Sequence, residues 1–420
     1  MITYLQKRGF VDALTSEELH SLCEKPIKVY VGFDPTADSL HLGNLIGIMA
    51  LAWAQRYGHT PVIVLGGATG RIGDPSGKSH ERPFLSLEMI RANVASIRTH
   101  FEQVLDFSGR YPEPIILNNT EWYQNYNLIE FLRDIGKHFR VGPMLAKESV
   151  KARLRSEEGM SFTEFSYQLI QAYDFYHLFS QHDVVLQMGG SDQWGNITAG
   201  IELIRKIEKK SAYGLTWPLL TRSDGKKFGK TEKGAVWLSA DKCSPYELYQ
   251  YFFRIPDADV IHMMKMLTFM ELEEITAIEQ EMGRSDYVVN SAQKRLAEEV
   301  TRILHGEQGV EVAIKVTKGA GPGKEGKLDA EVLSQIAKDM PSLILSREEV
   351  IGKRYADLAT QADLLSSKGE ANRLLKNGGA YLNNEKITDP SFEVKEKDLI
   401  EGEFLLIGAG KKKKALIRLR

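Results

Sequence analysis

The first half of the chain repeats one order: a short β-rich run, a polar or glycine-rich loop, and a segment with helical spacing. This order constrains the fold more than any other feature. The β-rich runs cover residues 27–33, 61–65, 115–117 and 184–187, with helical segments such as 41–57 and 87–105 between them. Short apolar strands that alternate with helices are typical of a parallel sheet with helices on both faces. We therefore expect an α/β domain over residues 1–231.

The strand signals stop after residue 243, and the rest of the chain divides into further parts. An all-helical domain is expected over 232–318, because helical spacing recurs at 258–267, 272–282 and 291–304. The glycine-rich run at 319–327 indicates a hinge, so residues 319–345 are assigned to a linker. Residues 346–420 carry a short helical segment followed by strand-like segments, which predicts a small α+β domain.

The charge of the chain is balanced overall but not along its length. Lys and Arg number 54 against 56 Asp and Glu. From Ile351 to the end there are 14 basic and 10 acidic residues, a net +4, which leaves −6 for the preceding part. A small basic module on an acidic body is compatible with RNA binding, and a solvated charged surface is the alternative.

Cysteine usage and hydropathy indicate a protein of the cytoplasm. The two cysteines, Cys23 and Cys243, are too far apart in sequence for a zinc or redox motif, so a reducing compartment is expected. The N-terminus is charged, unlike a signal peptide, and the longest apolar run, 45–54, is half a membrane span. The histidines lack the spacing of metal ligands, so no structural metal is expected.

The segment 34–44 lies where the first strand gives way to a helix. Open α/β folds bind ligands at the carboxyl edge of the sheet, and a helix N-terminus offers N–H groups and a favourable dipole to phosphate. His41 and Asn44 are three residues apart and share one face, and Gly43 between them permits a close approach. An ordinary helix start is the alternative.

Two further loops follow predicted strands. The glycine-rich run 66–79 imitates a Walker P-loop, but Ile72 stands where that motif needs glycine, so we expect a different loop close to a charged ligand. The segment 189–196 opens a helix, and Asp192 is placed to hold a ribose hydroxyl. A solvated turn is the alternative for the run 66–79.

Two other polar groups complete the candidate site. Tyr167, Gln171 and Asp174 fall on one stripe of a predicted helix, where a solvated face is the alternative. The loop 223–231 is cationic, and Lys227 and Lys230 could close over a polyphosphate.

These segments resemble a known family, the bacterial tyrosyl-tRNA synthetases of class I. His41-Leu-Gly-Asn44 is similar to the HIGH signature, and Lys227-Phe-Gly-Lys-Thr231 is similar to the KMSKS loop. Further similar segments are 30–39, 73–78, 162–174 and 187–196, and the likeness covers essentially the whole chain. The resemblance implies a Rossmann-like catalytic domain that binds ATP and tyrosine, an anticodon-side helical domain and a C-terminal RNA-binding domain.

The resemblance also implies a two-step ligase. Tyrosine's carboxylate attacks the α-phosphate of ATP, and the acyl group then moves to tRNA(Tyr). Positioning and charge stabilisation would carry the catalysis. ATP is a substrate accompanied by Mg²⁺, no organic cofactor is expected, and family members are homodimers.

The site residues implied by the resemblance fall into three groups. The phosphate and transition-state contacts are Thr36, His41, Asn44, Lys78, Arg82, Lys227, Lys230 and Thr231, with Gly43, Gly190 and Asp192 completing the ATP site. The tyrosine contacts are Tyr30, Asp34, Asp74, Tyr167, Gln171, Asp174, Gln187 and Gln193, with Tyr30 and Asp174 on the phenolic hydroxyl. The RNA contacts are Arg373, Lys376, Lys411, Lys412, Lys413 and Lys414.

The sequence departs from the signatures at few positions. Asn44 replaces the second histidine of HIGH and keeps a hydrogen-bond donor, and the KMSKS-like loop keeps both lysines. Three other functions stay open: a tryptophanyl-tRNA synthetase, a non-catalytic RNA-binding protein derived from a synthetase, and a nucleotidyltransferase acting on a small molecule. The Tyr30–Asp174 pair argues against tryptophan, because an indole has no hydroxyl for it to bind.

Overall fold

The computed structural model describes residues 1–76, 84–124, 126–155, 157–223, 228–231, 234–320, 328–337, 340–410 and 413–420. The chain forms two compact units. The first unit comprises residues 1–242 and 253–304, and the second unit comprises residues 243–252 and 305–420.

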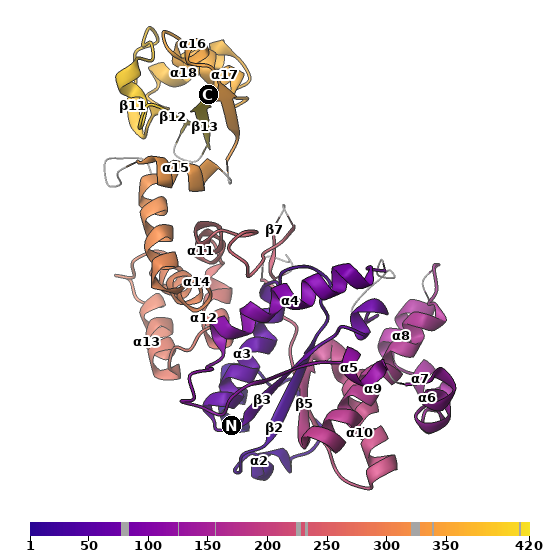
Figure 1. The fold of residues 1–420 in the computed structure, drawn as a ribbon. Helices are drawn as coiled ribbons and strands as arrows, with labels where there is room; N and C mark the ends of the chain where they lie inside the picture. Colours follow the sequence, from indigo (N-terminus) through magenta and orange to yellow (C-terminus); the bar gives the residue numbers. More distant parts are fainter. Residues whose placement is uncertain are drawn as a thin grey trace. The chain divides into compact units, whose positions relative to one another are not determined.

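The first unit is built on a six-stranded sheet with the order β1-β6-β5-β2-β3-β4 (Figure 1). Its strands are β1 (Ala13–Leu14), β2 (Lys28–Phe33), β3 (Thr60–Leu65), β4 (Ile115–Asn118), β5 (Val184–Gly190) and β6 (Tyr213–Trp217). All neighbouring strands pair in parallel except β1, which is antiparallel to β6. Along the chain, β2, β3 and β4 are added one after another toward one edge of the sheet. The chain then returns to the other side of β2, where β5 and β6 are added toward the opposite edge. The strand order therefore reverses between β2 and β5, where α/β sheets open a ligand crevice.

Helices cover both faces of this sheet. On one side lie α3 (Leu42–Arg56) and α4 (Leu87–Val104), and on the other lie α9 (Phe162–His182) and α10 (Trp194–Glu208) (Figure 1). The shorter helices are α1 (Ile2–Arg8), α2 (Leu19–Leu22), α5 (Thr120–Tyr123), α6 (Leu128–Asp134), α7 (Val141–Leu145) and α8 (Glu148–Leu154).

The alternation of side chains along β2 explains how the two faces are filled. Val31 and Phe33 meet α3 at Gly47, where a Cβ atom would lie 3.3 Å from Val31 Cγ1, so the missing side chain brings the helix close to the sheet. Tyr30 points to the other face and joins a buried cluster with Val62 and Phe175. A polar side chain in the middle of β2 is thereby placed in the interior.

Three helices form the remainder of the first unit: α12 (Asp257–Leu267), α13 (Leu272–Met282) and the first part of α14 (Ser291–Ala320). The guanidinium of Arg8, at the end of α1, is fully buried and donates to the carbonyl oxygens of Lys265 (2.8 Å), Thr268 (2.8 Å) and Met270 (2.9 Å). It satisfies carbonyls that a helix end leaves without partners.

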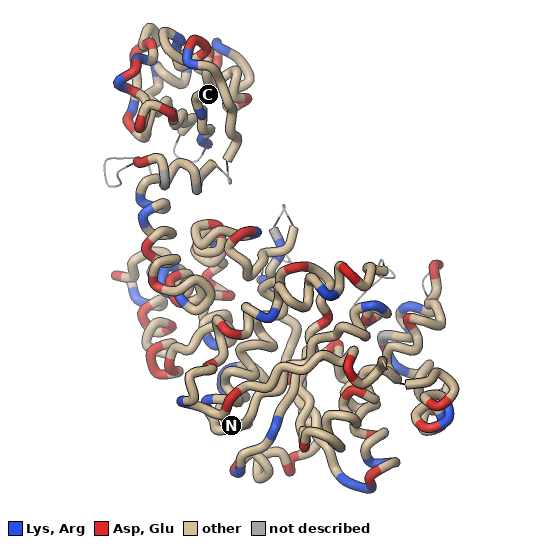
Figure 2. Tube along the Cα trace, in the orientation of Figure 1, with Lys and Arg blue, Asp and Glu red and all other residues tan. Residues whose placement is uncertain are grey.

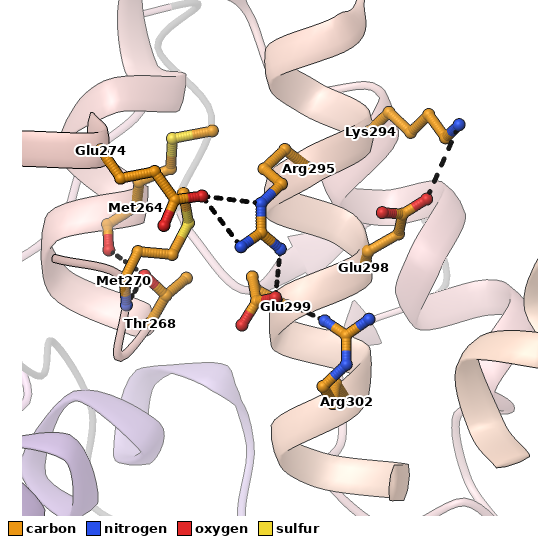
Figure 3. A network of polar contacts seen from close by, with 9 residues as sticks. All are labelled: Met264, Thr268, Met270, Glu274, Lys294, Arg295, Glu298, Glu299 and Arg302. Atoms are coloured by element: carbon orange, nitrogen blue, oxygen red, sulfur yellow. Dashed lines mark hydrogen bonds and ion pairs between the residues drawn. The ribbon is translucent and has the colours of Figure 1, made fainter. Parts of the chain in front are cut away.

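A polar network joins α13 to α14 (Figure 3). Arg295 contacts Glu274 on α13, at 2.9 Å from Nη2, and also pairs with Glu299 on its own helix. Arg302 pairs with the same Glu299 one turn further on. α14 contains a kink at Gly306, which has a φ of 68°, next to the boundary between the two units.

The second unit contains a five-stranded sheet with the order β11-β10-β12-β13-β9. Its strands are β9 (Ser342–Leu345), β10 (Ala380–Leu382), β11 (Glu385–Ile387), β12 (Phe404–Ala409) and β13 (Lys413–Leu419). Its helices are α11 (Pro245–Phe253), the second part of α14, α15 (Ala330–Ala337), α16 (Arg347–Val350), α17 (Tyr355–Gln361) and α18 (Lys368–Lys376).

The segment 319–345, assigned to a linker from sequence, contains regular structure among its described residues. Strand β9 pairs in parallel with β13, and α15 buries Val332 and Leu333. Leu333 belongs to a cluster with Phe404 and Leu406, so apolar side chains draw this stretch onto the sheet.

The predicted fold class is confirmed: a parallel α/β sheet, followed by helices and a small α+β part. Within the described residues, no helix is both long and apolar enough to cross a membrane.

Candidate active site

Three of the segments expected to carry the site, and one further segment at 119–123, leave the sheet at one edge. Asp34 follows β2, the loop 66–76 follows β3, residues 119–123 follow β4 and Ser191 follows β5. Because these strands are parallel, their carboxyl ends meet at the same edge. The candidate site is therefore a single place in the first unit.

His41 caps the helix that follows the first of these loops. Its Nδ1 accepts a hydrogen bond from the Gly43 N–H at 3.1 Å, and Asn44 Oδ1 accepts from the His41 N–H at 3.1 Å. A Cβ atom on Gly43 would lie 2.9 Å from the imidazole, so only glycine allows the ring to fold over this turn. Asn44 thus lies in the first turn of α3, and the N-terminus of a helix offers N–H groups and a favourable dipole to an anion.

The second signature loop lies against this same helix start. Gly229 has a φ of 71°, and a Cβ atom on it would lie 3.2 Å from Leu42 Cβ. Val236 joins the two segments: its N–H donates to the Gly229 carbonyl (2.8 Å), and its carbonyl accepts from the Leu42 N–H (3.0 Å). The structure thus brings the two predicted signature loops together.

Several predicted phosphate contacts can be placed only in part. Lys230 is exposed in β7 (Lys230–Thr231), which pairs with β8 (Gly234–Ala235), and Thr36 is exposed after β2. Lys78, Arg82 and Lys227 lie outside the described residues, as does the side chain of Thr231.

Asp34 lies at the end of β2 and binds two other side chains. Its Oδ1 accepts from Thr69 Oγ1 at 2.7 Å and its Oδ2 accepts from Tyr167 Oη at 2.8 Å. Gly66 makes room for this, since a Cβ atom there would lie 2.0 Å from Asp34 Oδ1. Burial, and next the charge of Asp34, raise the pKa of Tyr167. Tyr167 is thus hydrogen-bonded to Asp34, which is another of the predicted tyrosine contacts.

Asp74, Gln171 and Gln193 do form one network. Gln193 Nε2 donates to Asp74 Oδ2 at 2.7 Å, and Gln171 Nε2 donates to Gln193 Oε1 at 3.2 Å. Asn196 Nδ2 lies 3.0 Å from Gln171 Oε1 and 3.4 Å from the oxygen of Ser76. Asn196 and Ser76 were not among the predicted site residues. Their signal was available, because both stand in the polar loops already singled out.

Asp174 is fully enclosed by donors from the segment after β4. It accepts from Asn119 Nδ2 (3.1 Å), Trp122 Nε1 (2.8 Å) and Tyr123 Oη (2.9 Å). Burial raises the pKa of Asp174 to about 7, against the effect of these three hydrogen bonds. None of the three donors was predicted. The strand before them is evident in the sequence, but no pattern there indicates that the residues after it would donate to Asp174.

Tyr30 shares the cluster around Asp174. Its side chain is 2% exposed, and its hydroxyl has no hydrogen-bond partner among the described residues. Burial, and after it the charge of Asp174, raise the pKa of Tyr30. A buried hydroxyl without a partner costs about 1–3 kcal/mol, so its presence points to a ligand that completes the bond.

The remaining predicted contacts lie on β5 and just beyond it. Gln187 is buried, and its Oε1 has no partner among the described residues. A Cβ atom on Gly190 would lie 2.6 Å from Asp192 Oδ1, so the glycine allows the carboxylate to fold back over the strand end. Within the described ranges, no group of three or more His, Cys, Asp or Glu is arranged to hold a metal ion.

The predicted RNA contacts belong to the second unit. Arg373 and Lys376 are exposed on α18, and Lys413 is exposed on β13. Lys414 is half-buried and donates to Asn384 Oδ1 at 2.5 Å, and burial lowers its pKa to about 8. Lys411 and Lys412 lie outside the described residues. In this unit, basic and acidic positions are interspersed along the trace (Figure 2).

A histidine-capped helix, the loop of Gly229 packed on it and a buried polar network all lie at the carboxyl edge of one parallel sheet. The family described as tRNA synthetases class I (W and Y) matches residues 22–319, and the Tyrosine--tRNA ligase SYY-like C-terminal domain matches 332–417. The chain therefore belongs to the class I tRNA synthetases and, within them, to the tyrosine–tRNA ligase family.

Curated relatives of this family align with the chain over nearly its whole length. The tyrosine–tRNA ligase of Protochlamydia amoebophila is 58% identical over 415 residues, which cover 99% of this chain and 98% of the relative. That of Escherichia coli is 45% identical over 420 residues, with 99% and 98% coverage. Among solved structures, a C-terminally truncated mitochondrial tyrosyl-tRNA synthetase of Aspergillus nidulans superposes with a TM-score of 0.67 at 34% identity, covering 74% of this chain and 91% of that chain.

Proposed function

We propose that the chain joins tyrosine to tRNA in two steps at this sheet edge. A carboxylate oxygen of tyrosine bonds to the α-phosphorus of ATP as the bond to the bridging oxygen breaks, and pyrophosphate leaves. A hydroxyl of the terminal ribose of tRNA then bonds to the acyl carbon, and AMP leaves. The function agrees with membership of an ATP-dependent aminoacyl-tRNA ligase family.

The observation that carries the choice of tyrosine is the pair of Tyr30 and Asp174. Tyr30 offers a buried hydroxyl without a partner among the described residues, and Asp174 offers a buried carboxylate. A phenolic hydroxyl can accept from the first and donate to the second, so it satisfies both groups at once. A phenyl ring offers neither a donor to Asp174 nor an acceptor to Tyr30. An indole has an N–H donor but no hydroxyl oxygen, so it would leave the buried Tyr30 hydroxyl unpaired, which is costly.

The rest of tyrosine would lie along the polar network of the pocket. Asp74 is the carboxylate of that network and would hold the ammonium group, with Gln171 beside it. Gln193 would contact the carboxyl end, and Gln187 would line the pocket. Tyr167, which donates to Asp34, would complete the cradle of the ammonium group.

The ATP site would start at the cap of α3. His41 and Thr36 would hold the outer phosphates, Asn44 the ribose or the transition state, and Gly190 and Asp192 the ribose. The cations Lys78, Arg82, Lys227 and Lys230, with Thr231, would stabilise the charge that develops on pyrophosphate. Mg²⁺ enters as part of the nucleotide substrate, because its usual ligands include the phosphates themselves.

The second unit would bind tRNA. The support is the exposure of Arg373 and Lys376 three residues apart on α18, with Lys413 exposed on β13. We propose that the catalytic residues lie up to residue 231 and the tRNA-binding residues from 346 on, as expected from sequence. The compact units divide elsewhere, at residues 242 and 304, and the segment 319–345 packs with the second unit through α15 and β9. Two buried thiols, Cys23 and Cys243, fit a reducing compartment such as the cytoplasm.

We also propose a homodimer. Phe162 is 79% exposed at the start of α9, and further exposed apolar side chains come from α6, α7 and α8. Large exposed apolar side chains from consecutive elements are typical of a surface that another chain covers. Phe162→Glu should shift the mass measured by light scattering from two chains to one, and an unchanged mass would contradict the proposal.

The experiment that tests the function is ATP–pyrophosphate exchange with each standard amino acid in turn. We expect exchange with tyrosine and no comparable exchange with any other. Exchange with tryptophan but not with tyrosine would overturn the assignment.

A further inference from the structure

The three donors around Asp174 are distributed unequally over its two oxygens. Among the residues that the structure describes, Oδ1 accepts from Trp122 Nε1 and Tyr123 Oη, whereas Oδ2 accepts from Asn119 Nδ2 alone. A carboxylate offers about two acceptor positions on each oxygen. Oδ1 is therefore saturated, and one acceptor position is left on Oδ2.

The Tyr123 hydroxyl is itself held in place from two sides. It lies 2.7 Å from the carbonyl oxygen of Ile170, which stands one helical turn before Asp174 on α9. Its ring packs on Tyr173, with centroids 5.5 Å apart. The hydroxyl has one proton for two acceptors, and the ionised carboxylate is the stronger of them. Tyr123 therefore donates its proton to Asp174 Oδ1 at 2.9 Å, and the Ile170 carbonyl is a competing acceptor on the same helix.

We propose that Tyr123 is a specificity-determining positioning residue: by occupying Oδ1, it directs the one open acceptor of Asp174 to the hydroxyl of the amino-acid substrate. The inference rests on the proposed function, because it concerns selection of tyrosine. Without the Tyr123 hydroxyl, Oδ1 has an open position too and the carboxylate can rotate. Its hydrogen bond to the substrate is then less well directed.

The chain offers a matched control in Tyr126. Its ring belongs to the same aromatic cluster, with centroids 5.3 Å from Tyr173 and 5.5 Å from Phe131. None of the three hydrogen bonds found on Asp174 comes from it. Tyr126→Phe therefore removes a phenolic oxygen from the same cluster without touching Asp174.

The test compares the full-length wild type, Tyr123→Phe and Tyr126→Phe in ATP–pyrophosphate exchange with tyrosine and with phenylalanine. We expect the ratio of kcat/KM for tyrosine over phenylalanine to fall about tenfold in Tyr123→Phe, the usual loss for a hydrogen bond to a charged group. The loss should lie mainly in KM for tyrosine. Tyr126→Phe should keep the wild-type ratio.

The pH profile gives a second readout that a purely structural role would not move. Loss of a donor to the charged form raises the pKa of a carboxylate. In Tyr123→Phe, the rise of kcat/KM for tyrosine with pH should therefore move to higher pH, and the profile for phenylalanine should not. The other titratable groups around Asp174 are unchanged in both variants: Tyr30, Asp34, Tyr167 and Tyr173.

The outcomes separate the two proposals. An unchanged ratio and profile in Tyr123→Phe, or an equal loss in Tyr126→Phe, would overturn the role of Tyr123. A wild type that exchanges with tryptophan but not with tyrosine would instead overturn the proposed function. Thermal unfolding of both variants, which keep their rings, should match the wild type within a few degrees, and a much lower midpoint for Tyr123→Phe would show that the hydroxyl serves folding rather than selection.

Discussion

Gly229 lies directly on Leu42: a Cβ atom on the glycine would come within 3.2 Å of Leu42 Cβ and 3.5 Å of the Gly43 nitrogen. The glycine also has a φ of 71°, in the region that other residues rarely adopt. The close contact and the backbone conformation hold the loop around Gly229 against the first turn of α3. The position of the KMSKS-like loop therefore depends on that of the HIGH-like segment.

Gly229→Ala should therefore slow adenylate formation more than it weakens tyrosine binding. We expect a loss of roughly tenfold or more in the single-turnover rate, because displacement of a catalytic loop by even 1 Å is costly. Gly234→Ala is the control, since Gly234 also has a positive φ, 113°, but nothing lies within 4 Å of a Cβ there. Equal rates for the two variants would show that backbone strain alone, and not the contact with Leu42, decides the effect.

Lys230→Ala should reduce adenylate formation while tyrosine affinity stays nearly intact. The lysine is assigned to charge that appears on pyrophosphate, and loss of one such contact typically costs about 3 kcal/mol, roughly a hundredfold in rate. Lys294→Ala, which removes a surface lysine paired with Glu298, should have the wild-type rate. Rapid-quench measurement of tyrosyl-adenylate decides between them, and a wild-type rate for Lys230→Ala would rule out its role.

The raised pKa of Asp174 should make the stability of the protein depend on pH. The folded-state value of about 7 lies above the ordinary value near 4, so the folded protein binds the proton more tightly than the unfolded chain. The free energy of unfolding should then fall as pH rises from about 4 to 7, by a few kcal/mol at most.

Asp174→Asn isolates this contribution, because its amide does not titrate. Relative to the wild type, the unfolding temperature of Asp174→Asn should rise between pH 5 and pH 8. A constant difference over that range would mean that Asp174 does not titrate there. The same variant should lose discrimination of tyrosine from phenylalanine.

Arg153 and Glu164 form a buried ion pair whose side chains are each 3% exposed. Arg153 Nη2 lies 2.8 Å from Glu164 Oε2 and Nε lies 3.2 Å from Oε1. Arg153→Met should cost about 3–5 kcal/mol, because it leaves a buried charge without its partner. The double variant Arg153→Met with Glu164→Leu should regain most of that loss. Urea denaturation checks both, and a double variant as unstable as the single one would show that the pair itself supplies the stability.

A chain that ends near Gly321 should still form tyrosyl-adenylate but fail to charge tRNA. All the residues assigned to ATP and tyrosine precede residue 232, and the exposed basic residues assigned to tRNA, Arg373, Lys376 and Lys413, follow it. In the intact protein, tRNA affinity should fall with salt at a slope of roughly −0.7 to −0.9 per phosphate contacted, and the truncated chain should lose much of that slope. If the truncated chain charged tRNA at the full rate, the second unit would not be the RNA-binding part.

The loops at the carboxyl edge of the sheet were predictable from sequence. The order of strands and loops along the chain, and the polar residues of each loop, can be seen locally. Asp34, the glycine-rich loop at 66–76 and the loop from Gly189 all follow apolar runs, and parallel pairing then brings them together. Which side chains contact one another at that edge was harder to predict. The helical stripe of Tyr167 and Gln171 predicts a shared face, but it cannot say that Tyr167 binds Asp34 across the pocket.

Trp122 and Tyr123 show the other limit. Helix α5 is four residues long, which is too short for a periodic pattern. Its side chains reach Asp174 because the strand before it, β4, pairs with β3. Similarly, the strand β9 has only four residues and is stabilised by a partner some 70 residues later, so composition alone suggests a linker there. Short elements fixed by distant neighbours are the ones that a local pattern misses.

The burial of Arg8 has a consequence for the synthesis of this protein. Its carbonyl partners, such as that of Met270, are made 262 residues after it. At 5–20 residues per second, the ribosome needs roughly 13 to 50 s to make that stretch. During this time the nascent chain carries the guanidinium of its first helix without the acceptors it will have in the folded state. The first unit consequently completes its folding late in translation, when the helical segment that follows the sheet has left the ribosome.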